Sequence, residues 1–327
     1  MRLNKKDQLV RAVDNLFVNL SDSSKDYAEI LQACVTLKGL EEGRQVYMHL
    51  TFFGNEKHTL TGNKIINMFI KCGTMIDAKD VFDRLSNPDV VSWTLIVGGY
   101  ARHGLGAEAF KAFQRMKREG MSPNRVTFLC ILDALDSITD MISKGRMVHS
   151  DVVDSAVDSD IMIATALVNM YKKAGSIEDA CKVFHAMVTR DAILCTAMLD
   201  AFNQHGQAGE ALQLFGQMVC EGIEPNEYTF TSILSVCTSL ADLMEGQKVH
   251  MLIKFTDKEI GFVGAALVDM YAKCGSLNQA RFTFERLGER TVTSWTALIT
   301  GYAYKGHSKA ALELFQLMQA DGLEESF

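Results

Sequence analysis

The chain has 327 residues, of which 48% are hydrophobic and 22% are charged, so it is long enough to bury a substantial core. Its net charge of −7 argues against general affinity for nucleic acids, because most nonspecific binding depends on neutralising phosphates. Several kinds of site are also excluded, since no apolar run reaches the ~18 residues of a membrane span and no CxxC, HExxH or phosphate-binding GxxxxGKS/T motif occurs.

In chain order, the first 23 residues come before anything that repeats in full. They lack the apolar stretch of a secretory signal, and acidic residues interrupt their basic ones. They resemble only the second helix of the unit that repeats after them. Because the chain also stops soon after its last unit, we expect a fragment or a naturally short form of a longer protein.

The remainder of the chain is an internal repeat with a period of about 100 residues. The stretch VVSWTLIVGGYARHG, which starts at Val90, returns as VTSWTALITGYAYKG from Val292 and in part as AILCTAMLDAFNQHG from Ala192. INMFIKCGTMIDAKDVFDRL, VNMYKKAGSIEDACKVFHAM and VDMYAKCGSLNQARFTFERL keep the same offset, and so do LEEGRQVY, ISKGRMVH and LMEGQKVH. Three unit types therefore follow one another in a fixed order.

Each unit is predicted to be a pair of helices, since apolar residues recur at helical spacing on both sides of a hinge glycine such as Gly104. After the partial unit at residues 1–23, the predicted array fills residues 24–326. Its nine units are 24–58, 59–89, 90–124, 125–160, 161–191, 192–226, 227–260, 261–291 and 292–326.

One such helix pair cannot cover its own apolar face, so the copies must stack side by side. The predicted fold is all-α, an α-solenoid superhelix of stacked helix-turn-helix repeats. A tetratricopeptide array is the alternative, but its uniform units of about 34 residues would not produce a three-part cycle. Cys34 and Cys237 occupy equivalent positions at which the third copy carries Leu135, which indicates buried packing thiols rather than disulfides or metal ligands.

The units resemble the pentatricopeptide repeat family, in particular its plant class in which standard, long and short motifs alternate. VVSWTLIVGGYARHG followed by EAFKAFQRMKREGMSPN is similar to the standard motif, EYTFTSILSVCTSLADLMEGQKVH to the long one and GFVGAALVDMYAKCGSLNQARFTFERL to the short one. The resemblance covers residues 24–326. It implies sequence-selective binding of single-stranded RNA, with one base read per unit by a few side chains.

The same resemblance implies that the fifth and the last residue of a unit read one base together. A carboxylate only accepts hydrogen bonds and suits uracil or guanine, whereas a carboxamide accepts and donates and can face adenine. A short threonine leaves room for a purine, and the longer Asn63 suits a pyrimidine. The predicted RNA is 5′-U-A-n-G-A, with the long unit unread. The reading pairs are Asn63 with Asp89, Thr94 with Asn124, Thr165 with Asp191, Thr196 with Asn226 and Thr296 with Ser326.

Further positions are carried over from the family, with departures. Little selectivity is predicted for the pairs Ala265 with Thr291, Leu129 with Asp160, and Thr231 with Ile260. The family places an aliphatic second residue between adjacent bases, and Leu60, Val91, Met162 and Ile193 fit whereas Thr293 does not. Independently of the family, phosphate contacts are predicted for cations that share one place near the end of the first helix, where stacking would align them as a basic stripe: Lys71, Arg102, Lys173 and Lys273. The plain alternative is that the polar residues are helix caps and the cations complement helix dipoles.

The predicted function is that of an organellar RNA-binding specificity factor for C-to-U editing or RNA processing, in the mitochondrion or chloroplast. No catalytic residue, metal site or cofactor is expected, because the HxE and CxxC ligand motifs of the deaminase-like domain found in this class are absent. Editing would then need a deaminase-bearing protein in trans or on a C-terminal extension. No membrane and no small-molecule substrate is expected. The alternatives are a helical protein-binding scaffold, which suits the acidic charge, and a degenerate fragment without RNA affinity.

Overall fold

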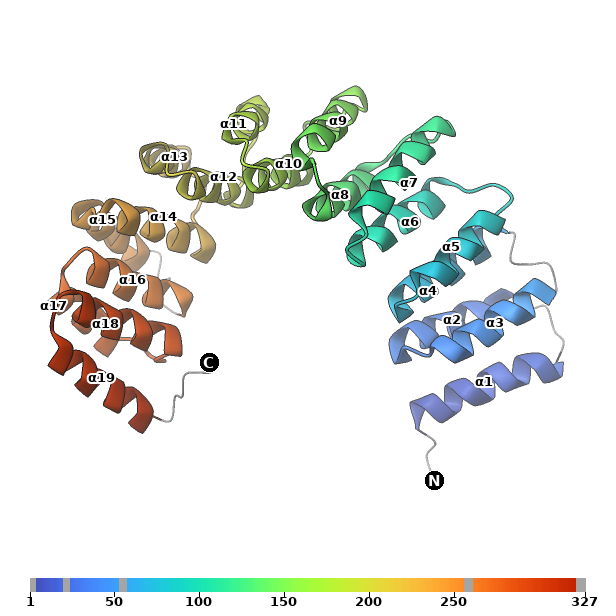
Figure 1. The fold of residues 1–327 in the computed structure, drawn as a ribbon, viewed down its shortest axis with the longest axis horizontal. Coiled ribbons are helices and arrows are strands. Elements are labelled where there is room, and N and C mark those ends of the chain that lie inside the picture. Colours follow the sequence, from blue (N-terminus) through green and yellow to red (C-terminus); the bar gives the residue numbers. More distant parts are fainter. Residues whose placement is uncertain (1–3, 20–23, 53–57, 256–260, 322–327) are drawn as a thin grey trace. The chain divides into compact units, whose positions relative to one another are not determined.

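The computed structural model describes residues 4–19, 24–52, 58–255 and 261–321 (Figure 1), and within these ranges the chain forms nineteen α-helices and no strand. The all-α solenoid class predicted from the repeat is therefore confirmed. The chain divides into two compact units, Met1–Met170 and Tyr171–Phe327. Each unit is a stack of helix pairs joined by short turns.

In the first unit, the first helices of successive pairs pack against one another: α2 on α4, α4 on α6, and α6 on α8. The second helix of a pair contacts both its own partner and the first helix of the next pair, as α5 does with α4 and α6. The helices are α1 (Lys5–Asn19), α2 (Ser24–Leu37), α3 (Leu40–Phe52), α4 (Thr59–Cys72), α5 (Met75–Arg84), α6 (Val90–Arg102), α7 (Gly106–Arg118), α8 (Arg125–Ala134) with a 3₁₀ turn (Leu135–Ser137), and α9 (Met141–Asp154).

The second unit repeats this packing, with α12 on α14, α14 on α16 and α16 on α18. Helix α10 (Ile161–Lys173) runs through the boundary between the two units. The helices that follow it are α11 (Ile177–Ala186), α12 (Ala192–Gln204), α13 (Ala208–Cys220), α14 (Glu227–Leu240), α15 (Leu243–Phe255), α16 (Phe262–Lys273), α17 (Leu277–Glu285), α18 (Val292–Tyr304) and α19 (Ser308–Ala320).

A glycine in the left-handed conformation follows the first helix of six pairs, as the sequence predicts. Gly104, with φ of 69°, donates its N–H to Ala101 O at 3.0 Å, and the next residue, Leu105, donates to Tyr100 O at 2.9 Å. These bonds satisfy carbonyls that the end of the helix would otherwise leave unpaired. The glycines are Gly73, Gly104, Gly175, Gly206, Gly275 and Gly306.

Aromatic pairs fill the space between neighbouring helix pairs. In the first unit, Phe82 of α5 meets the edge of Trp93 of α6, with ring centroids 4.6 Å apart, and Trp93 is 1% exposed. In the second unit, Phe284 and Trp295 form the same contact, also at 4.6 Å. Such pairs bury large apolar areas and prefer this edge-to-face geometry. The recurring tryptophan is therefore a core residue that locks one helix pair to the next.

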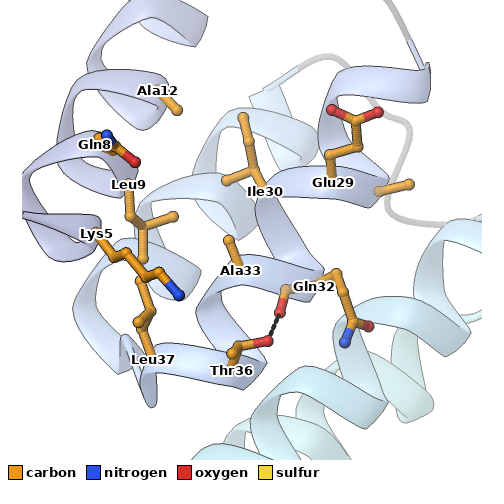
Figure 2. Close-up of a pocket in the computed structure, with 11 residues that line it drawn as sticks. Lys5, Gln8, Leu9, Ala12, Glu29, Ile30, Gln32, Ala33, Thr36 and Leu37 are labelled. Atoms are coloured by element: carbon orange, nitrogen blue, oxygen red, sulfur yellow. Dashed lines mark hydrogen bonds between the residues drawn. The ribbon is translucent and has the colours of Figure 1, made fainter.

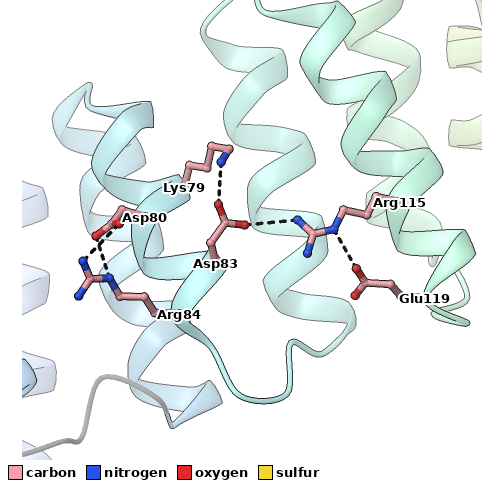
Figure 3. A network of polar contacts seen from close by, with 6 residues as sticks. All are labelled: Lys79, Asp80, Asp83, Arg84, Arg115 and Glu119. Atoms are coloured by element: carbon pink, nitrogen blue, oxygen red, sulfur yellow. Dashed lines mark hydrogen bonds and ion pairs between the residues drawn. The ribbon is translucent and has the colours of Figure 1, made fainter.

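A polar network ties the second helices together over this aromatic pair in the first unit (Figure 3). Arg115 of α7 lies 5.2 Å from the centre of the Trp93 ring, so the cation faces the electron-rich aromatic surface. Its guanidinium also contacts Asp83 of α5 at 3.3 Å and Glu119 at 2.8 Å. One arginine thus links two successive helix pairs.

A groove of about 740 Å³ lies between α1 and α2 (Figure 2). The repeat explains it, because the equivalent face of α14 is covered by α12. There Ser232 Oγ donates to Asp200 at 2.6 Å, and Asn203 donates to Ser235 Oγ at 3.2 Å. The groove is thus a stacking face of the repeat, and none of the predicted site residues lines it. Its walls include Leu9, Ala12, Ile30, Ala33 and Leu37.

Neither a metal site nor a membrane span occurs in the part of the chain that the structure describes. No group of three or more His, Cys, Asp or Glu side chains there could hold a metal ion, and none of its helices is long and apolar enough to cross a bilayer. Cys34 and Cys237 are fully buried, and burial raises the pKa of each thiol to about 12. The prediction of buried packing thiols is confirmed for Cys34 and Cys237, whereas Cys220 is exposed at the end of α13.

Candidate nucleic-acid interface

The predicted reading residues lie at the starts of the first helices. The fifth residue of a unit stands in the second turn, and the last residue is the N-cap of the next first helix. Asp89, Asn124, Asp191 and Asn226 each accept a hydrogen bond from the backbone N–H three residues later. These side chains are therefore helix caps, as the plain alternative states. Capping engages one side-chain oxygen and leaves the other polar atom of each group for a ligand.

Asn63 and Asp89 belong to one hydrogen-bond network. The Asn63 amide donates to Asp89 Oδ1 at 3.1 Å, the backbone N–H of Ser92 donates to the same oxygen at 2.8 Å, and Ser92 Oγ donates to Asn63 Oδ1 at 2.6 Å. Burial alone would raise the pKa of Asp89, but the bonds from Ser92 and Asn63 outweigh it and hold that pKa below its ordinary value. Asp89 is therefore an ionised acceptor at neutral pH.

Thr94 and Asn124 are joined through a third residue, Thr127. The hydroxyls of Thr94 and Thr127 are 2.7 Å apart, and the Thr127 N–H donates to Asn124 Oδ1 at 3.0 Å. Within the described part of the chain, no hydrogen bond engages the Asn124 Nδ2 group. Because the amide oxygen is held by the cap, the carboxamide offers a ligand mainly its donor rather than both functions.

The second unit contains the same arrangement at Thr196, Thr229 and Asn226. The two threonine hydroxyls are 2.8 Å apart, and the Thr229 N–H donates to Asn226 Oδ1 at 2.9 Å. Thr196 is 8% exposed, and Thr229 is fully buried. The same Thr–Thr–Asn hydrogen-bond arrangement thus occurs at equivalent repeat positions in both compact units.

Two further predicted pairs are not brought together in the described structure. Thr165 belongs to the first unit and Asp191 to the second, so their pairing stays a prediction. Thr296 is exposed on α18, but its predicted partner Ser326 lies outside the described residues. Ile260, the predicted partner of Thr231, also lies outside them.

The pairs for which little selectivity is predicted differ in chemistry from the others. Asp160 forms an ion pair with Arg125 at 2.8 Å, so its carboxylate already has a cationic partner, and the fifth residue of that unit, Leu129, has no polar group. Ala265 is 6% exposed and equally lacks a polar group, while Thr291 caps α18 through Ser294. In both pairs the fifth residue has no polar group, so neither pair offers the combination of a threonine hydroxyl and a free carboxamide donor that Thr94 and Asn124 provide.

A row of exposed apolar residues accompanies the reading residues. The predicted residues Leu60, Val91, Met162 and Ile193 are 79%, 54%, 51% and 63% exposed. Because these apolar side chains recur at one repeat position, they mark a candidate binding surface. Sequence reasoning missed three more at the second position of other units, which a systematic reading of that position would have found. They are Val126, Tyr228 and Phe262.

The predicted phosphate-contacting cations are all exposed in the last turns of first helices, where they also complement the helix dipole. Lys71 and Arg102 stand in the first unit, and the described residues give neither of them an ion-pair partner. In the second unit, Lys273 pairs with Asp269 of its own helix at 2.9 Å. Lys173 occupies the matching place on α10.

Comparison with family models identifies this architecture. The PPR repeat family model matches residues 88–136 and 190–239, and the PPR repeat model matches residues 163–191 and 293–323. The chain belongs to the pentatricopeptide repeat family. The matched segments contain most of the predicted reading residues, from Asp89 to Asn226.

Curated pentatricopeptide repeat relatives come from Arabidopsis thaliana. A chloroplastic pentatricopeptide repeat-containing protein is 35% identical over 296 residues, which are 90% of this chain and 48% of the relative. A mitochondrial one is 33% identical over 319 residues, which are 97% of this chain and 50% of the relative. The chain thus spans about half the length of these curated relatives.

Among solved structures, the chain is similar to the pentatricopeptide repeat protein PPR10. The crystal structure of PPR10 in complex with an 18-nt psaJ RNA element has a TM-score of 0.69 and 16% sequence identity, and the match covers 98% of this chain and 49% of that one. The crystal structure of PPR10 from maize has a TM-score of 0.59 and 17% identity, over 97% of this chain and 52% of that one. At this identity the likeness concerns the fold.

Proposed function

We propose that this protein binds single-stranded RNA in a sequence-selective manner in a plant organelle, the mitochondrion or the chloroplast. The observation that carries the proposal is the recurrence of one reading geometry, Thr94 with Asn124 and Thr196 with Asn226, in two separate units. Support also comes from the family, from the RNA complex of PPR10, and from relatives whose names place them in chloroplasts or mitochondria.

The proposed readout follows from the polar atoms that each pair leaves free. Asp89 offers an ionised acceptor to the ring N–H of uracil, and the neighbouring Asn63 leaves room for a pyrimidine. Asn124 and Asn226 offer an N–H donor to N1 of adenine, an acceptor that uracil and guanine lack at that place. The proposed target remains 5′-U-A-n-G-A, in which the G position rests on the sequence-based pair Thr165 with Asp191.

Affinity in this proposal comes from stacking and a few cations rather than from overall charge. Val91 and its counterparts at the second position of each unit would cover base faces with apolar surface. Lys71, Arg102, Lys173 and Lys273 would contact phosphates. With four such phosphate contacts, the logarithm of the binding constant should fall with the logarithm of the salt concentration with a slope of about −3.

The fixed order of three unit types supports the plant class with alternating standard, long and short motifs, and the division into the partial unit 1–23 and nine units over 24–326. We assign the chain a role as specificity factor in C-to-U editing or RNA processing, without catalysis or a cofactor of its own. A deaminase-bearing protein would act in trans or as part of a longer chain. The second candidate, a protein-binding scaffold, is favoured only by the acidic charge.

The test is binding of the purified protein to RNA that contains UAnGA, measured against a scrambled RNA at moderate salt. The double variant Asn124→Asp, Asn226→Asp replaces the donor by an acceptor, so preference should change from A towards G at both positions. Asn203→Asp is the matched control, because Asn203 of α12 contacts Ser235 and is not at a reading position. Binding of neither RNA would instead support the scaffold or a degenerate fragment, and nuclease-resistant partners would favour the scaffold.

A further inference from the structure

A buried hydroxyl stands between the two reading residues in both Thr–Asn pairs. Thr127 and Thr229 are the third residues of α8 and α14, and each is 0% exposed. Thr127 Oγ1 lies 2.7 Å from the Thr94 hydroxyl and accepts from the Asn124 backbone N–H at 3.3 Å. In the second unit the same distances are 2.8 Å and 3.2 Å. The hydroxyl therefore touches both readers while it is itself inaccessible to a base.

Counting protons fixes the direction of these bonds, because each hydroxyl can donate only one. Thr94 Oγ1 lies 2.7 Å from Val90 O, and a carbonyl only accepts, so the Thr94 proton is used there. The Thr127 proton has two acceptors within reach, Thr94 Oγ1 at 2.7 Å and Asn124 Oδ1 at 3.1 Å. The shorter contact takes it, because the Thr94 proton is already used and no other proton is left for that bond. A directed chain results, from the Asn124 N–H through Thr127 and Thr94 to the carbonyl of Val90.

The direction of this chain decides what each reader can offer a base. With its proton engaged, Thr94 has only a lone pair left and is an acceptor. Asn124 has its oxygen held by the Thr127 N–H at 3.0 Å and keeps its Nδ2 donor. An acceptor beside a donor complements the amino donor and ring-nitrogen acceptor on the Watson–Crick edge of adenine. Cytosine shares that pattern, and guanine and uracil reverse it at the ring nitrogen.

Other units show what happens when a part of the arrangement is missing. Leu194 replaces the hydroxyl after Asp191, so within the described residues that carboxylate receives the backbone bond at 2.8 Å and no hydroxyl bond. Ser294 has a hydroxyl, but the fifth residue Ala265 has none, and the Ser294 proton goes to Thr291 O at 2.9 Å. A third-residue hydroxyl also bridges Asn63 and Asp89, since Ser92 Oγ donates to Asn63 Oδ1 at 2.6 Å and accepts from the Asp89 N–H at 3.2 Å. Among the described pairs, a bridge that ends on a fifth-residue threonine occurs at Thr94 and Thr196, which is where adenine readout is proposed.

We propose that the third-residue hydroxyls of Thr127 and Thr229 are specificity-positioning groups that tie each Thr–Asn pair together and set its hydrogen-bond polarity. The inference rests on the proposed function. The hydroxyls act through the reading residues and touch no base. They should therefore govern the choice of base at one RNA position each, Thr127 at the second base of UAnGA and Thr229 at the fifth.

The experiment uses the full chain with Thr127→Val and Thr229→Val, which keep the shape of the side chain and remove the hydroxyl. Loss of one net hydrogen bond should reduce discrimination of A over G roughly three- to tenfold, at the second base for Thr127→Val and at the fifth for Thr229→Val. The serine variants should restore it. Thr238→Val is the matched control on α14, since its hydroxyl bonds only Leu234 O, at 2.8 Å, and discrimination should stay unchanged.

Two results would overturn the inference. One is a folded valine variant that still prefers A as strongly as the unmodified protein. The other is an equal loss at both bases from a single substitution, which would indicate general destabilisation. If the valine variants do not fold, Thr127→Cys takes their place, because a thiol is a weak donor and should give intermediate discrimination; full discrimination with Cys also contradicts the proposal. If the unmodified protein shows no preference for UAnGA, the proposed function itself has failed.

Discussion

Gly106, at the start of α7, should tolerate no side chain, although it is not one of the predicted RNA-contacting residues. A Cβ added there would lie 2.3 Å from the backbone oxygen of Ala134 and 2.3 Å from Ser137 Oγ. The serine could rotate, but the carbonyl belongs to Ala134, the last residue of α8 before the 3₁₀ turn, and is part of the backbone. Gly106→Ala must therefore push α7 and the end of α8 apart. The equivalent position in the second unit is Ala208, where α14 continues to Leu240 without such a turn.

The cost of this change can be worked from its parts. Overpacking against a fixed backbone atom costs about 1–3 kcal/mol, and the separation also weakens the 3.1 Å bond from Gly106 N–H to Ser137 Oγ, worth about 1 kcal/mol. Alanine recovers at most ~1 kcal/mol of helix propensity. We expect a net loss of about 1–4 kcal/mol in the free energy of unfolding. The reverse change in the second unit, Ala208→Gly, should cost no more than ~1 kcal/mol.

Urea unfolding followed by tryptophan fluorescence measures the loss locally. The chain has two tryptophans, so Trp295→Phe leaves Trp93, on the neighbouring helix α6, as the reporter. Because α8 starts at the Asn124 cap, Gly106→Ala should also weaken A preference at the second RNA base and leave the fifth base unchanged. A midpoint within experimental error of the parent would refute the steric argument, and equal losses at both bases would refute its local character.

Two other predictions concern titration and thiol reactivity. Because the pKa of Asp89 is held below its ordinary value, the carboxylate stabilises the fold above the ordinary carboxyl pKa, and this stabilisation is lost as pH falls through the lowered value of the folded state. Asp89→Asn should therefore flatten the decrease of the urea midpoint at acid pH. A pH profile identical to that of the unmodified protein would exclude this contribution. Burial and a pKa of about 12 should keep Cys34 and Cys237 unreactive towards iodoacetamide near neutral pH, while the exposed Cys220 is labelled. Peptide mass spectrometry measures the labelling of each cysteine, and equal labelling of all three would contradict the prediction.

The fold was accessible from the sequence because its determinants are local. Helical spacing, the hinge glycines and the three-part period all lie within about 100 residues and recur. The exposed second-position residues were partly accessible for the same reason. The bridge through Thr127 was not, since its hydroxyl meets Thr94 from 33 positions away and the direction of the bonds depends on atomic distances. The cap signal, a hydroxyl three residues after Asn124, was present, but it predicts a helix start rather than a link between readers.

The arginine over the recurring phenylalanine ring shows where comparing the repeats position by position fails. In the second unit it comes from the turn before a first helix: Arg190 lies 4.5 Å from the Phe184 ring centre, and Arg290 lies 5.2 Å from that of Phe284. At the equivalent position the first unit has Pro88, and Arg115 of α7 supplies the positive charge instead. The acidic partners of these arginines nevertheless stand at equivalent positions of the repeat: Glu119, Glu221 and Asp321.

The interaction is thus retained in space while its residue has moved along the sequence. The move matters for the proposed readout, because Arg190 and Pro88 directly precede the caps Asp191 and Asp89. An arginine holds that turn by its contacts with the ring and the acid, whereas proline holds it by fixing its own backbone φ angle. Two different physical constraints therefore place the same kind of carboxylate at the start of a first helix, as expected if the position of that group is what the repeat must preserve.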